Sequence, residues 1–281
     1  MKSKKVLFIT QEINPYIDES EVSLLGRRVP QFVQERGREI RTFMPKWGLI
    51  NERRSQLHEV IRLSGMNLII DGTDHLLILK VASIPSARMQ VYFIDNDDYF
   101  QKRLEACDEK GVEYPDNGER AIFYARGVLE TVKKLRWVPD IIHCQGWIST
   151  IAPLLIKTCY HEEPCFRDSR IIFTPCGNDL KLLTTDQFRA NIQFKNMTGH
   201  ELDNYPANLS IRDLYHLALD YSEGLLLTPG NNDEELRQYC EQRGLPVFGP
   251  VDISDRNNGA AVVDFIDAVW SEGKVEEPVK D

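Results

Sequence analysis

Three segments at the start of the chain constrain its fold most strongly. An apolar run at Lys5–Thr10 predicts a buried strand, and apolar residues at helical spacing over Val22–Glu35 predict an amphipathic helix that Pro30 weakens or kinks. A second strand is predicted at Glu39–Phe43. A strand, a helix and a strand within about forty residues form a βαβ unit, which requires a parallel sheet. The sequence therefore predicts an α/β fold.

The same alternation returns later in the chain, after a β-rich interval. The runs within His58–Asn96 predict a small antiparallel extension of the sheet. Beyond it we predict strands at Asp140–His143, Ser169–Thr174 and Gly224–Thr228, and helices at Gly118–Lys134, Trp147–Cys159, Ser210–Asp220, Asp233–Arg243 and Gly259–Ser271. We expect one Rossmann-like, doubly wound domain over residues 1–271, with a mostly parallel sheet, a loop or excursion near 180–208 and a frayed charged tail at 272–281.

Charge and composition exclude several classes of protein. The net charge of −9 argues against a nucleic-acid partner, because phosphate binding needs clustered Lys and Arg. The apolar run Val6–Ile9 is too short for a signal peptide, and no segment approaches the length of a membrane span. We therefore predict a cytoplasmic chain with no membrane partner.

Motifs for metals and cofactors are also missing. Cys159, His161 and Cys165 lie close together but lack the fourth ligand of a structural zinc site. The sequence contains neither G-x-G-x-x-G after its first strand nor a Walker-type phosphate loop. We predict no metal and no cofactor.

The segment Pro139–Trp147 is the most informative about a site. Its turn, Cys144-Gln145-Gly146, follows a predicted buried strand, and ligands in open α/β sheets bind at the carboxyl ends of strands. A pocket at this edge is therefore expected, although no catalytic residue is assigned.

Five motifs in a consistent order resemble the N-terminal domain of bacterial glycogen and starch synthases, over roughly the first 175 residues. They are Lys5–Tyr16; Gly37–Arg41 with Met44–Ile50; Val91–Asn96 with Tyr99-Phe100; Asp116–Phe123; and Pro139–Trp147 followed by Ala152-Pro153. The resemblance implies half of a two-domain, B-type glycosyltransferase, a family that transfers glucose from ADP-glucose to an α-1,4-glucan. It also implies a nucleotide sugar or an α-glucan as a possible ligand.

The departures from this family fall on its working residues. The family's K-T-G-G-L, which holds the phosphates of the nucleotide sugar, is Asp18-Glu19-Ser20-Glu21-Val22 here, with three carboxylates. The family's H-A-H-D-W is His143-Cys144-Gln145-Gly146-Trp147, so a histidine and an aspartate are lost. Its F-T-x-H-N is Phe173–Gly177, which loses a further histidine.

Four residues remain as candidates for binding a sugar or another ligand. Asp116 matches an aspartate that the family places near the sugar, but capping of the following helix is the favoured alternative. His143, Gln145 and Trp147 match the strand-end motif, with buried packing as the alternative for His143 and Trp147.

These observations leave three hypotheses. The first is a synthase-like protein without autonomous catalysis, which binds a sugar, a glucan or a protein, or self-associates through the cleft face that would meet the family's second domain. The chain ends where that domain would begin. The alternative is an active glucosyltransferase half completed by a separate chain. The third is another small-molecule activity at Cys144, Gln145 and Cys176.

Overall fold

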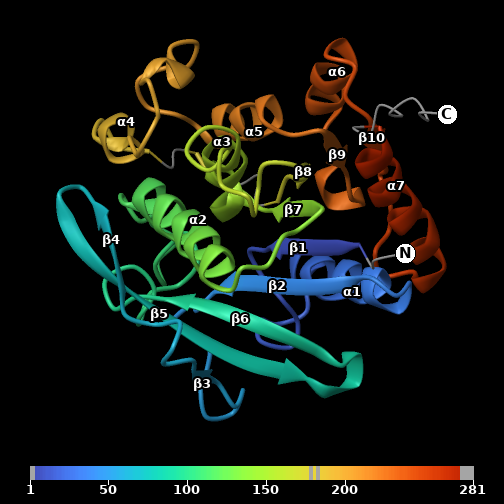
Figure 1. Ribbon diagram of the computed structural model, residues 1–281, viewed down its shortest axis with the longest axis horizontal. Helices are drawn as coiled ribbons and strands as arrows, with labels where there is room; N and C mark the ends of the chain where they lie inside the picture. The colour runs from blue at the N-terminus through green and yellow to red at the C-terminus, as the bar shows by residue number, and fades with distance from the viewer. Residues whose placement is uncertain (1–3, 177–179, 182–183, 273–281) are drawn as a thin grey trace, which may run out of the picture.

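The computed structural model describes residues 4–176, 180–181 and 184–272. The predicted tail at 272–281 lies outside the described residues, apart from Glu272. Within the described part, ten strands form one sheet in the order β10-β9-β8-β7-β1-β2-β6-β5-β3, with β4 paired to β5 (Figure 1).

Seven neighbouring strands of this sheet run parallel, which confirms the predicted α/β fold. One of them, β10, was not predicted, because its two residues lie between Pro246 and Gly249 and form no apolar run that periodicity would detect. The parallel strands are β1 (Lys5–Ile9), β2 (Glu39–Pro45), β6 (Met89–Asp95), β7 (Ile141–Gln145), β8 (Arg170–Thr174), β9 (Gly224–Leu226) and β10 (Val247–Phe248).

The predicted antiparallel extension is confirmed. It consists of β3 (His58–Glu59), β4 (Met66–Ile70) and β5 (Thr73–Ile84), and the 3-10 turn η1 (Pro85–Ala87) joins β5 to β6. Strand β6 pairs antiparallel with β5 and parallel with β2. It therefore joins the extension to the parallel sheet.

Helices cover both faces of the parallel sheet, as a doubly wound fold requires. Alternate residues of β1 enter two cores: Val6 and Phe8 pack beneath α1 and α7, whereas Leu7 and Ile9 belong to the larger core with α2, α3 and α5. These helices are α1 (Glu21–Glu35), α2 (Asn117–Lys134), α3 (Ile151–Lys157), α5 (Ile211–Asp220) and α7 (Gly259–Ser271).

The remaining helical elements are shorter. Helix α6 (Glu234–Gln242) follows β9 and the 3-10 turn η4 (Pro229–Asn231), and η5 (Arg256–Asn258) precedes α7. The predicted excursion near 180–208 contains α4 (Phe188–Asn191) and the turn η3 (His200–Leu202). No helix in the described residues is both long and apolar enough to cross a membrane.

Helix α1 is fixed at its start by Ser20. The Ser20 hydroxyl accepts from the Ser23 amide at 3.0 Å, and the Ser23 hydroxyl accepts from the Ser20 amide at 2.9 Å. The helix continues through Pro30 to Glu35. At Gly26 a Cβ atom would lie 2.0 Å from the Glu12 carbonyl oxygen, so glycine lets α1 pack closely on the loop after β1.

The predicted helix Trp147–Cys159 divides into two pieces. A 3-10 turn, η2 (Trp147–Ser149), precedes α3. The hydroxyls of Ser149 and Thr150 donate to the carbonyls of Gly146 and Trp147 at 2.9 and 2.7 Å. Such local side-chain bonds compete with regular helix hydrogen bonding, so the α-helix starts only at Ile151.

Candidate functional site

The direction of the chain reverses between β1 and β7. From β1 the chain passes through α1 to β2 on one side, whereas from β7 it passes through α3 to β8 on the other. In doubly wound folds this point opens a crevice at the carboxyl ends of the strands, where ligands bind. The loops after β1 and β7 are therefore the candidate functional site.

The side chain of Gln11 fills the space between these two loops. The side-chain Oε1 atom of Gln11 accepts from the Trp147 backbone amide at 3.1 Å, and the backbone carbonyl oxygen of Gln11 accepts from the Trp47 indole at 2.9 Å. Gly146 has a φ of +83°, and a Cβ atom there would lie 2.3 Å from Gln11 Oε1. Both the backbone conformation and the packing therefore require glycine at 146.

His143 and Gln145 lie in contact with each other inside the protein. The Gln145 amide Nε2 lies 3.2 Å from His143 Nδ1, and His143 Nε2 lies 2.8 Å from the Thr174 hydroxyl. Burial lowers the pKa of His143 to about 3, so the imidazole is neutral, with Nδ1 accepting from the amide and Nε2 donating to Thr174. Among the described residues Gln145 Oε1 has no hydrogen-bond partner.

Trp147 is buried in the larger core rather than beside these two residues. Its ring centroid lies 6.2 Å from that of Trp47, and 1% of its surface is exposed. Three of the four candidates, His143, Gln145 and Trp147, therefore lie in the interior, and their roles in binding stay predictions.

Asp116 belongs to a charged cluster before α2. It occupies the N-cap position of that helix, but its side chain makes no capping hydrogen bond, so the favoured capping interpretation is wrong. The carboxylate instead pairs with Arg103, one contact measuring 2.7 Å. Burial disfavours ionisation of Asp116, but the hydrogen bonds and charge of Arg103 outweigh it and lower the pKa of the carboxyl.

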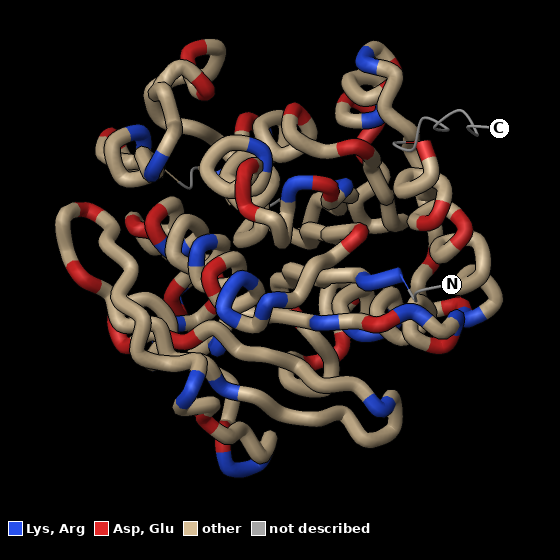
Figure 2. Tube along the Cα trace, in the orientation of Figure 1, with Lys and Arg blue, Asp and Glu red and all other residues tan. Residues whose placement is uncertain are grey.

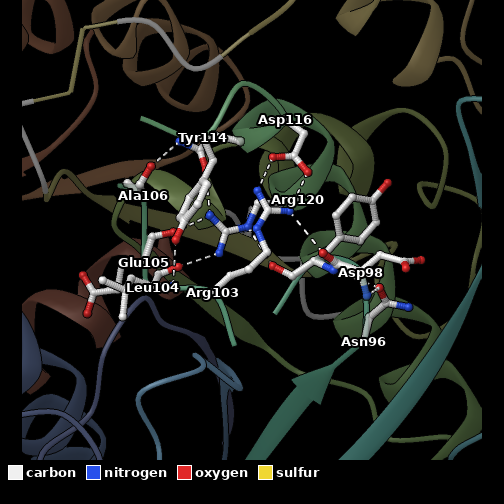
Figure 3. Close-up of polar contacts among 11 residues, drawn as sticks. Asn96, Asp98, Arg103, Leu104, Glu105, Ala106, Tyr114, Asp116 and Arg120 are labelled. Atoms are coloured by element: carbon white, nitrogen blue, oxygen red, sulfur yellow. Dashed lines mark hydrogen bonds and ion pairs between the residues drawn. The ribbon is translucent and has the colours of Figure 1, made fainter. Parts of the chain in front are cut away.

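Arg120 fixes the loop that carries Arg103. Figure 3 shows its guanidinium group among loop atoms: it donates to the carbonyls of Tyr99 at 2.9 Å, Leu104 at 2.8 Å and Glu105. It also donates to Asn117 Oδ1 at 2.8 Å. Burial lowers the pKa of Arg120 to about 9. Arg120 thus ties the loop after β6 to the start of α2.

Two carboxyl groups that sequence reasoning missed meet at the same edge of the sheet. Glu12 is buried and accepts from Gln11 Nε2 at 2.9 Å and from the Ser20 hydroxyl at 3.1 Å. The Glu105 carboxyl hydrogen-bonds Glu12, and burial together with the Glu12 charge raises the pKa of Glu105 to about 8. The Glu105 carboxyl is therefore largely protonated at neutral pH. No sequence signal joins the two groups, since Glu105 lies in an irregular loop.

The acidic segment after β1 reaches across to the loop after β9. Both carboxylate oxygens of Glu21 accept from the Gly230 amide at 3.0 Å. A Cβ atom at Gly230 would lie 2.1 Å from Glu21 Oε2, so glycine allows this approach. A backbone amide that would otherwise be available to an anion is thus bound by a carboxylate of the chain itself.

The cysteines at this edge are unsuited to nucleophilic chemistry. Burial raises the pKa of Cys144 and of Cys176 well above the usual value, and the charges of Glu12 and Glu21 raise that of Cys176 further. Both remain protonated thiols at neutral pH, whereas the thiolate is the nucleophile. Elsewhere, Cys159 donates to the Phe194 carbonyl at 3.1 Å. The described residues contain no group of three or more His, Cys, Asp or Glu side chains placed to hold a metal ion.

Sequence comparisons find a matching protein family over most of the chain. Residues 5–208 match the starch synthase catalytic domain family. Glycogen synthase from Pelodictyon phaeoclathratiforme is 38% identical and that from Chlorobium limicola 39% identical, each over 171 residues that cover 60% of this chain and 35% of the relative. The chain therefore spans about a third of the length of these curated relatives.

Among solved structures, the fold is similar to the catalytic domain of starch synthase IV from Arabidopsis thaliana, bound to ADP and acarbose. The TM-score is 0.69 at 14% identity, over 90% of this chain and 52% of the other. This likeness establishes the fold. With the match over residues 5–208, it follows that the chain belongs to the starch synthase catalytic domain family.

Proposed function

We propose that this chain binds an α-glucan and does not by itself transfer glucose from ADP-glucose. Residues 1–271 form the binding unit in this proposal. The proposal rests mainly on one observation: at the carboxyl edge of the sheet, the carboxylate of Glu21 binds the Gly230 amide that an anionic ligand would otherwise use.

The electrostatics of this edge oppose a nucleotide sugar. Asp18, Glu19 and Glu21 stand in the segment where the family resemblance expects a lysine and two glycines to hold a diphosphate. The charges of Glu12 and Glu21 both act on nearby Cys176. A diphosphate would face like charge, and the amide of Gly230 is already bound to Glu21. Glucose transfer also requires preorganised positive charge for the leaving diphosphate, which these residues do not provide.

An α-glucan avoids this penalty because it carries no charge. The structural neighbour holds acarbose as well as ADP. Of the four candidate residues, Asp116 has a partly exposed side chain, so a ligand can reach it directly. Carboxylates accept hydrogen bonds from sugar hydroxyls, which suits Asp116 to this role.

Co-sedimentation with glycogen tests the proposal. The purified chain is expected to sediment with glycogen, and Asp116→Asn is expected to weaken binding. Asp97→Asn, an equal change of charge at an exposed position, serves as the control and is expected to leave binding unchanged. A chain that stays in the supernatant at every glycogen concentration would contradict the glucan proposal.

Two further expectations belong to this proposal. All six cysteines are unpaired, which suits a reducing compartment, so we propose that the chain works in the cytoplasm. Self-association or a protein partner at the cleft face stays a prediction, which the mass of the chain in solution will test.

A further inference from the structure

A cavity of about 300 Å³ lies beside α1 and gathers positive charge. Arg27 and Arg28 of α1 line it, together with Arg256 of η5. In Figure 2 acidic and basic residues are spread over the whole fold of a chain whose net charge is −9. Three arginines around one small cavity therefore form a local exception to the charge of the molecule.

Two of these arginines lack a neutralising carboxylate. Arg27 is partly buried and donates to the Ser86 hydroxyl at 3.1 Å, and Arg28 donates to the Ser254 carbonyl. Neither guanidinium has an ion-pair partner within 4.0 Å in the described part of the chain. Burial lowers the pKa of Arg27, and the charge of Arg28 lowers it further while Tyr16 acts in the opposite direction. An anion between the two would relieve this repulsion.

The acidic groups nearby do not cancel the charge. Glu19 lines the cavity. The pKa of Asp252 is lowered mainly by hydrogen bonds from Ser254 and to a smaller extent by the charge of Arg28. Arg256 pairs with Glu35 at 3.2 Å, and both side chains of that pair are largely exposed. The lining therefore retains the two guanidinium groups of Arg27 and Arg28 against the single carboxylate of Glu19.

We propose that this cavity binds a small soluble phosphomonoester that also carries hydroxyl groups. Arg27 and Arg28 have unused N–H donors for the phosphate oxygens. The amide side chains of Asn14 and Gln31 also line the cavity and can bond hydroxyls. Gln31 Nε2 donates one hydrogen to Glu35 at 2.7 Å and keeps a second. The volume is at the lower end of small-molecule sites, roughly 300–1,000 Å³, so the ligand is of small-metabolite size. This site is separate from the proposed glucan contact at Asp116.

Calorimetry of the full chain with inorganic phosphate and with glycerol 3-phosphate tests the proposal. Both probes are expected to bind, with glycerol 3-phosphate the tighter. The double variant Arg27→Gln/Arg28→Gln is expected to lose at least about tenfold in affinity, because hydrogen bonds to charged groups are among the stronger ones. The matched control is Arg53→Gln/Arg54→Gln, an adjacent exposed pair with the same change of charge, which should bind as the parent does.

The single variant Arg28→Gln keeps the test decisive if the double variant does not fold. It removes only the exposed hydrogen bond from Arg28 to the Ser254 carbonyl, and it is also expected to weaken binding. The proposal is overturned if the parent chain binds neither probe at millimolar concentration. It is also overturned if the Arg27/Arg28 and Arg53/Arg54 variants behave alike, or if binding occurs only to vesicles that contain phosphatidic acid.

Discussion

Gly146 occupies the position where the family resemblance expects an aspartate, and the structure explains why a side chain is not accommodated. Its φ is +83°, and the Gln11 side chain fills the space that a Cβ atom would need. The absence of the aspartate is thus coupled to a second residue, from the loop after β1. Sequence comparison detected the loss, but the compensating role of Gln11 depends on the pairing of β1 with β7.

Substitution at this glycine should separate backbone strain from steric overlap. Gly65 also has a positive φ, +86°, but its Cβ atom would meet nothing within 4 Å. Gly65→Ala is expected to cost about 1 kcal/mol of unfolding free energy through strain alone. Gly146→Ala should cost about 1–3 kcal/mol more, because Gln11 must move. Urea denaturation measures both, and equal losses would show that Gln11 does not fill the site.

The raised pKa of Glu105 predicts a pH dependence of stability. The Glu105 carboxyl titrates near 4.5 when unfolded, but its pKa is about 8 in the folded chain. Folding therefore takes up a proton between these values, so the contribution of this group is greatest below pH about 4.5 and declines as the pH rises toward about 8. The slope from one proton is at most about 1.4 kcal/mol per pH unit.

Glu105→Gln should remove this part of the slope and raise the stability at pH 8 relative to the parent chain. Glu109→Gln, at an exposed position of the same loop, is the control and should leave the slope unchanged. Denaturant unfolding between pH 5 and 9 provides the comparison. A Glu105→Gln slope equal to that of the parent would show that Glu105 does not take up a proton on folding.

At the scale of elements, Arg120 holds the loop after β6 against α2. Its donors reach three loop carbonyls and one side chain, and lysine lacks the planar fork that makes these contacts together. Arg120→Lys is expected to lower the unfolding free energy by about 2–5 kcal/mol, because carbonyls are left unpaired in the interior. Arg103→Lys, at the partly exposed ion pair with Asp116, should cost less than about 1 kcal/mol.

Amide hydrogen exchange locates the effect of these two variants. Exchange is expected to accelerate at residues 99–106 in Arg120→Lys, while Arg103→Lys leaves that loop close to the parent rate. Equal destabilisation by the two variants would mean that Arg120 does not anchor the loop.

The elements themselves could largely be predicted from the sequence. The buried strand runs, the helices on both faces of the sheet and the antiparallel extension all follow from local periodicity and turn residues. The site could not, because no local pattern pairs the residues in contact: Glu12 meets Glu105, Glu21 meets Gly230, and Arg103 meets Asp116. The capping interpretation of Asp116 failed for this reason, because the Asp116 carboxylate forms an ion pair with Arg103 in the preceding loop.

At the scale of the whole molecule, the fold establishes the family, whereas the side chains of the site determine the chemistry at the carboxyl edge of the sheet. The sheet order, the helices on both faces and the match over residues 5–208 establish the family. The side chains at the switch point form a neutral imidazole, protonated thiols and a carboxyl pair. The family fold is thus shown, whereas the loss of diphosphate binding at this edge is our proposal.

Release of ADP from ADP-glucose, measured with the purified chain in the presence of glycogen, tests this account most directly. The account predicts no release above the background of a heat-denatured sample, at a glycogen concentration where the chain sediments with the polymer. Steady release of ADP together with elongation of the glycogen would contradict it, because the anionic edge would then accommodate the diphosphate it is expected to repel.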